Sequence, residues 1–204
     1  MKKTIRDIDV ADKRVLVRVD YNVPINSDLK IVDDTRIQAT LPTIKYLIEH
    51  KAKVILCSHL GRPEGVSDSK LSLRPVLARL SKLLDMPISF AEDILDKSTK
   101  ELVEKMQGGD VLMLENIRFF KQEEKNDEAF AKKLASLADY FVLEAFGTAH
   151  RKHASTYGVS KFIPAVSGFL VEKELIMFNK VLNNPERPFV AILGGAKIAD
   201  KLPV

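Results

Sequence analysis

The fold is decided by a short apolar run and the polar residues that follow it, Val15-Leu16-Val17-Arg18-Val19 and then Asp20-Tyr21-Asn22. The run lacks the strict alternation of a half-exposed strand, and it therefore predicts a strand that is buried on both faces. Four more apolar runs rich in Val, Ile and Leu recur at residues 54–57, 111–114, 140–143 and 189–193. We expect each of them to be a buried strand.

Helical patterns separate these runs. Apolar residues recur at helical spacing, and we expect helices over residues 37–48, 73–84, 126–137 and 168–182. Cap candidates open the first three, at residues 33–35, at Ser72 and at Asn126. Strands and helices in alternation need crossover connections, so the chain is predicted to be α/β, with a three-layer αβα, doubly wound, mainly parallel sheet.

The composition limits the class of protein. Hydrophobic residues make up 46% of the 204, which is enough for a packed core, and no apolar run approaches the roughly 20 residues of a membrane-spanning helix. The single cysteine, Cys57, excludes a disulfide scaffold and fits a reducing compartment. No signal-peptide core follows Lys2 and Lys3, so we expect a cytoplasmic protein without a membrane partner. A net charge of +4 without a basic cluster gives no reason to expect a nucleic-acid partner.

The last predicted strand, at residues 189–193, has no later strand to pair with. It either joins the edge of the preceding sheet or begins a second domain, and we favour the second domain because edge strands are usually short and polar. The glycine turn Gly194-Gly195-Ala196-Lys197 comes next. If it opens a helix, Lys197 and Lys201 share one face near a helix N-terminus, where anions bind favourably. The spacing is not that of a Walker A loop.

Basic and polar residues follow four of the predicted strands. Ligands of a doubly wound sheet lie beyond the carboxyl ends of its strands, and arginine offers a planar fork of donors to phosphate and carboxylate. The candidates for an anion site are Asp20, Asn22, Arg36, His59, Arg62, Arg118 and Arg151. Taken singly, each arginine could instead be a surface or cap residue. Together they favour a small polyanion that carries both a phosphate and a carboxylate.

Other residues near these positions have competing interpretations. Arg18 lies inside the first strand, and we expect a buried structural partner of an acidic group. His59 could be a catalytic base, although an anion donor is favoured. His150 and His153 could suggest a metal pair, but no third ligand is obvious and no metal is expected. Cys57 is predicted to be a buried structural thiol.

Five segments together resemble the phosphoglycerate kinase family, in order and approximate spacing. They are Arg18-Val19-Asp20-Tyr21-Asn22-Val23-Pro24, Ser58-His59-Leu60-Gly61-Arg62-Pro63, Leu114-Glu115-Asn116-Ile117-Arg118-Phe119, Ala145-Phe146-Gly147-Thr148-Ala149-His150-Arg151 and Gly194-Gly195-Ala196-Lys197. The resemblance runs from about residue 5 to the end. It implies a Rossmann-like N-terminal domain that binds 3-phosphoglycerate at residues 1–168, an interdomain helix at 169–185, and at 186–204 the start of a domain that binds nucleotide.

The resemblance also implies roles for the candidates. Asp20 and Asn22 would contact the glycerate end, and the substrate's carboxylate and phosphate would be held by a basic patch of His59, Arg62, Arg118 and Arg151. Arg36 would stabilise the transferring phosphoryl group, Lys197 would move in on domain closure, and Lys201 would reach the nucleotide phosphates.

The implied reaction is reversible phosphoryl transfer between 1,3-bisphosphoglycerate and ADP, giving 3-phosphoglycerate and ATP in glycolysis. The enzyme would be a monomeric kinase with a carboxyl group as acceptor, and Mg²⁺ would accompany ATP or ADP mostly in a C-terminal half. We expect the 204 residues alone to bind substrate weakly without turnover. The alternatives are a non-catalytic module that binds a phospho-acid, and a folding unit kept for its structure. Where the family usually has Asn-Asp, this chain has Leu143-Glu144, which puts the hydrogen bonding near Arg151 in question.

Overall fold

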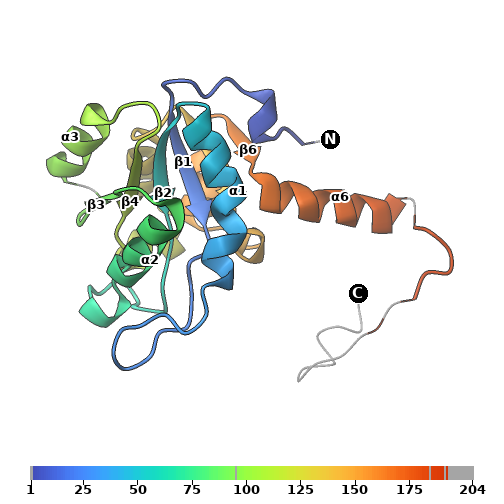
Figure 1. Ribbon diagram of the computed structural model, residues 1–204, viewed down its shortest axis with the longest axis horizontal. Helices are drawn as coiled ribbons and strands as arrows, with labels where there is room; N and C mark the ends of the chain where they lie inside the picture. Colours follow the sequence, from blue (N-terminus) through green and yellow to red (C-terminus); the bar gives the residue numbers. More distant parts are fainter. Residues whose placement is uncertain (1, 95, 184, 191, 193–204) are drawn as a thin grey trace. The chain divides into compact units, whose positions relative to one another are not determined.

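Six parallel strands form one sheet at the centre of the first unit of the chain (Figure 1). The computed structural model describes residues 2–94, 96–183, 185–190 and 192, and the chain divides into two compact units, Met1–Glu172 and Lys173–Val204. The sheet order is β3-β4-β2-β1-β5-β6. The strands are β1 Arg14–Val19, β2 Lys53–Cys57, β3 Ser89–Ala91, β4 Val111–Leu114, β5 Tyr140–Glu144 and β6 Ala165–Ser167. Every pairing between neighbours is parallel, which confirms the predicted α/β class.

Four of the predicted strands are confirmed as β1, β2, β4 and β5. All of β4 and nearly all of β1 and β2 are buried, as the continuous apolar runs require. The edge strands β3 and β6 were not predicted. Each is three residues long and carries an exposed residue, so neither leaves an apolar run in the sequence.

Helices cover both faces of the sheet. They are α1 Thr35–Glu49, α2 Arg74–Leu84, α3 Lys97–Lys105 and α5 Glu128–Ala135. The chain also forms the short helix α4 Lys121–Glu124, and α6 Phe169–Asn183, which begins in the first unit and continues into the second. Successive β1 residues point to opposite faces, so that Val17 packs with α1 and α2 in one core while Leu16 packs with α3 and α5 in the other. The fold is therefore the predicted three-layer arrangement. No described helix has the length and apolarity needed to cross a bilayer.

The start of α5 differs from the prediction. Asp127, and not Asn126, is the cap, because the Asp127 carboxylate accepts a hydrogen bond from the Phe130 amide at 2.8 Å. Asn126 has a φ of +51°, a left-handed conformation that turns the chain just before the helix.

The strand predicted at residues 189–193 is not formed by its described members. Phe189, Val190 and Ile192 have no strand structure, and residues 191 and 193 lie outside the described residues. They belong to the second unit, whose described part contains no other strand to pair with. Lys197 and Lys201 also lie outside the described residues.

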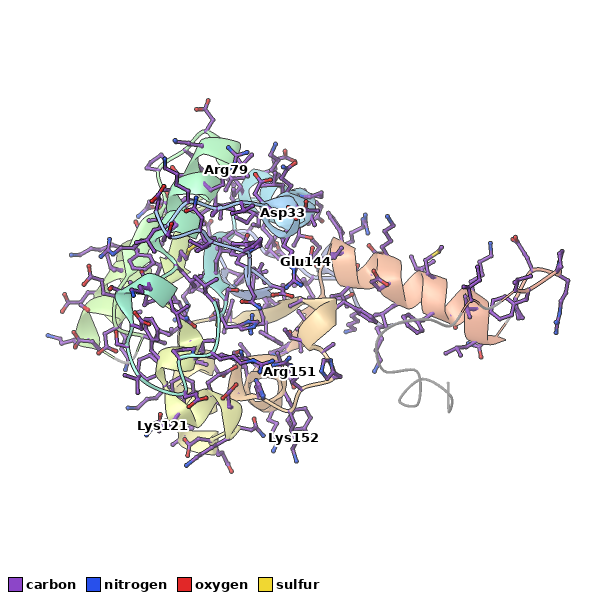
Figure 2. The ribbon with its side chains drawn as sticks, turned by 90° about the horizontal axis from the view of Figure 1, so that it is seen from below. Asp33, Arg79, Lys121, Glu144, Arg151 and Lys152 are labelled. Atoms are coloured by element: carbon purple, nitrogen blue, oxygen red, sulfur yellow. The ribbon has the colours of Figure 1, made fainter. Side chains whose placement is uncertain are left out.

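Glu144 is fully buried and fixes the beginning of α6. Its carboxylate accepts hydrogen bonds from the Thr43 hydroxyl and, at 3.1 Å, from the Leu170 amide in the first turn of the helix. A Cβ on Gly168 would lie 2.2 Å from this carboxylate, so a larger residue there would displace it. Glu144 thus makes these hydrogen bonds with α1 and with the first turn of α6, beside which Figure 2 shows it.

Candidate anion-binding site

The candidate site lies where the sheet order reverses. From β1 the chain moves through α1 to β2 on one side, whereas β5 lies on the other side of β1 and leads on to β6. The loops after β1 and β5 therefore run in opposite directions from the carboxyl ends of these strands, and doubly wound proteins bind ligands at such a position.

Asp20 and Arg36 meet at the β1 side of this edge. Asp20 directly follows β1, and Arg36 lies in the first turn of α1. The Arg36 guanidinium donates to the Asp20 carboxylate at 2.7 Å, while just over half of the Arg36 side chain stays exposed. The carboxylate thus orients the arginine and leaves donors of its fork free.

The loop after β2 is bonded to the loop after β1. The Ser58 hydroxyl accepts from the Tyr21 amide at 2.9 Å and donates to the Val19 carbonyl at 3.0 Å. The Gly61 amide donates to the Asn22 side-chain oxygen at 2.9 Å. Gly61 has a φ of +62°, which turns the chain so that Arg62 is exposed beyond it.

Arg118 is the most buried of the predicted anion-binding arginines, with 5% of its side chain exposed. It lies in the single 3₁₀ turn Ile117–Phe119 after β4, and its Nη1 donates to the Gly61 carbonyl at 2.9 Å. Its Nε lies 3.2 Å from a Glu124 oxygen but is not aligned for a hydrogen bond, and it has no acceptor in the part of the chain that the structure describes. A buried guanidinium with an unused donor favours an anionic ligand, because the unmade bond costs free energy.

Asn116 holds Arg118 and the Gly61 loop together. Its buried amide donates to the carbonyls of Leu60 at 2.7 Å and Leu71 at 2.9 Å, and its oxygen accepts from the Arg118 amide at 3.1 Å. The motif around Asn116 was recognised in the sequence, but this function was not. Nothing in the spacing shows that one amide binds two loops.

Arg18 is buried, as expected, and lies behind the candidate site. Its Nε donates to the Ser155 hydroxyl at 2.8 Å, and one Nη lies 3.2 Å from Nδ1 of His59. Ser155 in turn donates to the buried carboxylate of Glu123 at 2.6 Å. Neither Ser155 nor Glu123 was predicted, because they are far from Arg18 in sequence and carry no motif of their own.

Positive charge dominates the site. Burial, followed by the charges of Arg18, Arg118 and Arg151, lowers the pKa of His59 from 6.5 to about 2. Burial is also the main cause of the lowered pKa of Arg118, and its effect exceeds that of the Glu124 carboxylate. A site in which each cation opposes protonation of the others accommodates an anion in preference to a further cation.

The segment after β5 contributes Arg151. It follows the 3₁₀ turn Phe146–Thr148, and its amide donates to the Thr148 carbonyl at 2.9 Å (Figure 2). His153, two residues later, lies with its Nδ1 3.8 Å from a Glu123 oxygen, and burial lowers its pKa. His153 thus adds to the site, whereas His150 is exposed. Among the described residues, no group of three or more His, Cys, Asp or Glu side chains could hold a metal ion.

Cys57 is fully buried at the end of β2, and burial raises the pKa of its thiol to about 12. Because the thiolate is the reactive form, we expect the folded chain at pH 8 to resist a thiol reagent that modifies the urea-unfolded chain rapidly. Measuring the rate of modification in both states tests this. Equal rates would contradict the buried position.

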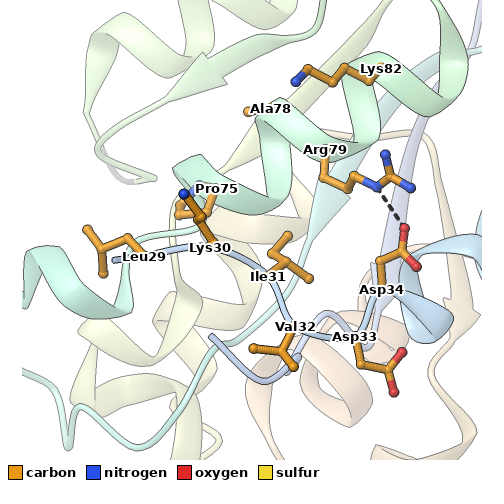
Figure 3. Close-up of a pocket in the computed structure, with 10 residues that line it drawn as sticks. All are labelled: Leu29, Lys30, Ile31, Val32, Asp33, Asp34, Pro75, Ala78, Arg79 and Lys82. Atoms are coloured by element: carbon orange, nitrogen blue, oxygen red, sulfur yellow. Dashed lines mark hydrogen bonds and ion pairs between the residues drawn. The ribbon is translucent and has the colours of Figure 1, made fainter. Parts of the chain in front are cut away.

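Two cavities border the loop after β1. One, of about 690 Å³, lies beside the candidate site between segments 22–29 and 60–71 and includes Asn22 and Gly61 in its wall. The other, of about 600 Å³, lies between segment 29–34 and α2, where Arg79 donates to Asp34 at 2.7 Å (Figure 3). None of the predicted anion-binding residues lines the second cavity.

Comparisons with known proteins agree with these features. The family model for phosphoglycerate kinase matches residues 5–204. A phosphoglycerate kinase from Desulforudis audaxviator is 55% identical over the whole chain and 52% of its own length, and one from Aquifex aeolicus is 56% identical over 51% of its length. The solved phosphoglycerate kinase of Coxiella burnetii is 38% identical, with a TM-score of 0.88 over 98% of this chain and 50% of its own. The solved enzyme of Pyrococcus horikoshii OT3 has a TM-score of 0.87 at 37% identity. The chain thus spans about half the length of the curated relatives it matches.

Proposed function

Since the chain belongs to the phosphoglycerate kinase family, we propose that its first unit holds 3-phosphoglycerate and 1,3-bisphosphoglycerate for phosphoryl exchange with ADP and ATP. The observation that carries this proposal is buried Arg118, whose Nε has no hydrogen-bond acceptor in the described chain and whose charge lies close to those of Arg18 and Arg151. Such a cluster of arginines suits a ligand with both a phosphate and a carboxylate.

The proposed roles follow the positions of the side chains. His59, Arg62, Arg118 and Arg151 bind the two anionic groups, while Asp20 and Asn22 bind the glycerate end. Arg36, exposed and oriented by Asp20, neutralises charge on the transferring phosphoryl group. Phosphoryl transfer needs positioning and charge neutralisation more than covalent chemistry. These residues can provide both the positioning and the neutralisation.

The nucleotide side of the reaction depends on other residues in this proposal. Lys197 would approach the phosphates on closure and Lys201 would bind the nucleotide, with residues 1–168, 169–185 and 186–204 as substrate domain, connecting helix and start of the nucleotide domain. Mg²⁺ with ATP or ADP would reduce the charge of the phosphates. Because the described residues offer no cluster for it, we assign Mg²⁺ no ligand here. We also propose a cytoplasmic monomer, which a single buried cysteine suits.

We propose that these 204 residues bind substrate without turning it over, since they match about half of their relatives' length. Calorimetric titration with 3-phosphoglycerate, with inorganic phosphate as control, tests binding. We expect saturable binding well above the phosphate control, and binding no stronger than that of phosphate would contradict the substrate assignment. A coupled assay on the same preparation should stay at background. Activity clearly above background would contradict the absence of turnover.

The second candidate function is a module that binds a phospho-acid without catalysis in any context. The Asp20–Arg36 pair argues against it, because an exposed arginine held in place by a carboxylate suits a charge that develops during reaction. Adding a separately prepared nucleotide-binding half distinguishes the two candidates. Restored activity supports the kinase, and continued inactivity of a correctly folded mixture supports the module.

A further inference from the structure

His59 faces a group that can only donate hydrogen bonds. Its Nδ1 lies 3.2 Å from Nη2 of Arg18, inside the protein, with 4% of His59 and 2% of Arg18 exposed. A guanidinium has five N–H donors and no acceptor, so the contact is a hydrogen bond only if Nδ1 presents a lone pair. A proton on Nδ1 would instead point at a cationic donor.

Arg18 cannot turn away from His59, because its other bonds fix the guanidinium plane. One Nη donates to the Val19 carbonyl and Nε donates to the Ser155 hydroxyl at 2.8 Å. That hydroxyl donates to one oxygen of Glu123 at 2.6 Å, and the Ser155 amide donates to the other oxygen at 2.8 Å. The direction of donation is therefore fixed in every hydrogen bond of this series, which runs from the Glu123 carboxylate through Ser155 and Arg18 to His59.

We propose that Arg18 is a positioning residue that holds His59 in the neutral tautomer with its proton on Nε2, so that His59 is a fixed hydrogen-bond donor to the bound anion and not a base. The identity of that anion rests on the proposed function. Nε2 has no hydrogen-bond partner in the described part of the chain. With Nδ1 occupied and Nε2 protonated, the ring has no free lone pair with which to accept a proton, which decides between the two roles considered for His59.

The charges around His59 support the neutral form. Arg18 from β1, Arg118 from the turn after β4, and Arg151 and His153 from the segment after β5 all oppose a positive charge on the ring. The nearby carboxylate, Glu123 of α4, already accepts both Ser155 hydrogen bonds. Burial and these charges hold the pKa of His59 far below 6.5, so the donor persists through the physiological range.

Nitrogen NMR of the imidazole rings tests the proposal in the unmodified chain. The chain has four histidines, and the signal lost in His59→Gln identifies His59. We expect the Nε2–H pattern with no titration between pH 5 and pH 8, and a coupling through the hydrogen bond from Arg18 to Nδ1. A proton on Nδ1, or a ring that becomes charged in this range, would overturn the proposal whatever any variant does.

Arg18→Met tests the role assigned to Arg18. We expect the fixed tautomer to be lost, with His59 showing both tautomers or titrating, and affinity for 3-phosphoglycerate to fall by about tenfold. A His59 spectrum identical to that of the unmodified chain would overturn the role. If this variant does not fold, the unmodified chain provides a second test. A spectrum that resolves both ring nitrogens of His59 but shows no coupling between Arg18 and Nδ1 would also overturn the role assigned to Arg18. Failure of the unmodified chain to bind 3-phosphoglycerate while His59 keeps its Nε2–H pattern would remove the proposed function and leave the tautomer standing.

Discussion

Arg118→Ala is expected to weaken 3-phosphoglycerate binding by about 10- to 100-fold, since a hydrogen bond to a charged group contributes about 1.5–3 kcal/mol. The reason for so large an effect is the environment of the side chain. Arg118 is almost fully buried, its Nη1 binds the Gly61 carbonyl, and its Nε has no hydrogen-bond acceptor in the described chain, with only the misaligned Glu124 carboxylate 3.2 Å away. Calorimetric titration of variant and parent chain measures the loss.

Arg14→Ala is the matched control for this experiment. Arg14 is the first residue of β1 and so lies at the amino ends of the strands, whereas the candidate site lies at their carboxyl ends. It binds the Asp139 carboxylate at 2.6 Å. Its removal should reduce thermal stability slightly and leave the affinity for 3-phosphoglycerate unchanged. Unchanged affinity in a folded Arg118→Ala chain would exclude Arg118 from the site. An equal loss in both variants would show that the effect comes through folding.

Prediction from sequence succeeded where residues are buried on both sides. β4 is a continuous apolar run, and β1 is apolar from Val15 to Val19 except for Arg18, because helices pack on both faces of the sheet. This pattern can be recognised without knowing which strands are neighbours. The short edge strands β3 and β6 were missed because one side of each has no strand to bury it. At residues 189, 190 and 192 the opposite error occurred, because a strand was predicted and is not formed. An apolar run forms a strand only where a neighbouring strand is available to pair with it.

The residues of the candidate site could be predicted from the sequence, but the hydrogen bonds between them could not. The strand-end rule selected Asp20, Arg36 and Arg118 because the ends of parallel strands meet at one edge, wherever they lie in the chain. The hydrogen bonds of Arg18 to Ser155 and of Asn116 to two loops depend on atomic distances that no spacing encodes. These connections decide which donors remain unpaired and so which groups can bind an anion.

Arg36→Ala is expected to lower kcat by about 10³-fold in a two-domain protein that joins these residues to a nucleotide-binding half, because a charge-stabilising arginine contributes about that much to phosphoryl transfer. The Michaelis constant for the phosphoglycerate should change far less, since Arg36 is exposed and already paired with Asp20 before the reaction. Arg36→Lys should recover only part of the rate, because lysine keeps the charge but lacks the planar fork.

Arg79→Ala is the control for the fall in kcat expected of Arg36→Ala, because it also removes an arginine–carboxylate ion pair near the start of α1. Arg79 binds Asp34, the residue that precedes α1, at 2.7 Å (Figure 3). Its side chain is 43% exposed, against 53% for Arg36. It lines the cavity between segment 29–34 and α2 and not the anion site, so its removal should leave kcat unchanged. If Arg36→Ala raised only the Michaelis constant, Arg36 would bind substrate and transition state equally, and the rate effect would have to come from elsewhere. If Arg36→Ala lowered kcat without raising the Michaelis constant, and Arg79→Ala did not, Arg36 would stabilise the transition state. That result fits a hydrogen-bond donor that Asp20 holds in place before the phosphoryl group arrives.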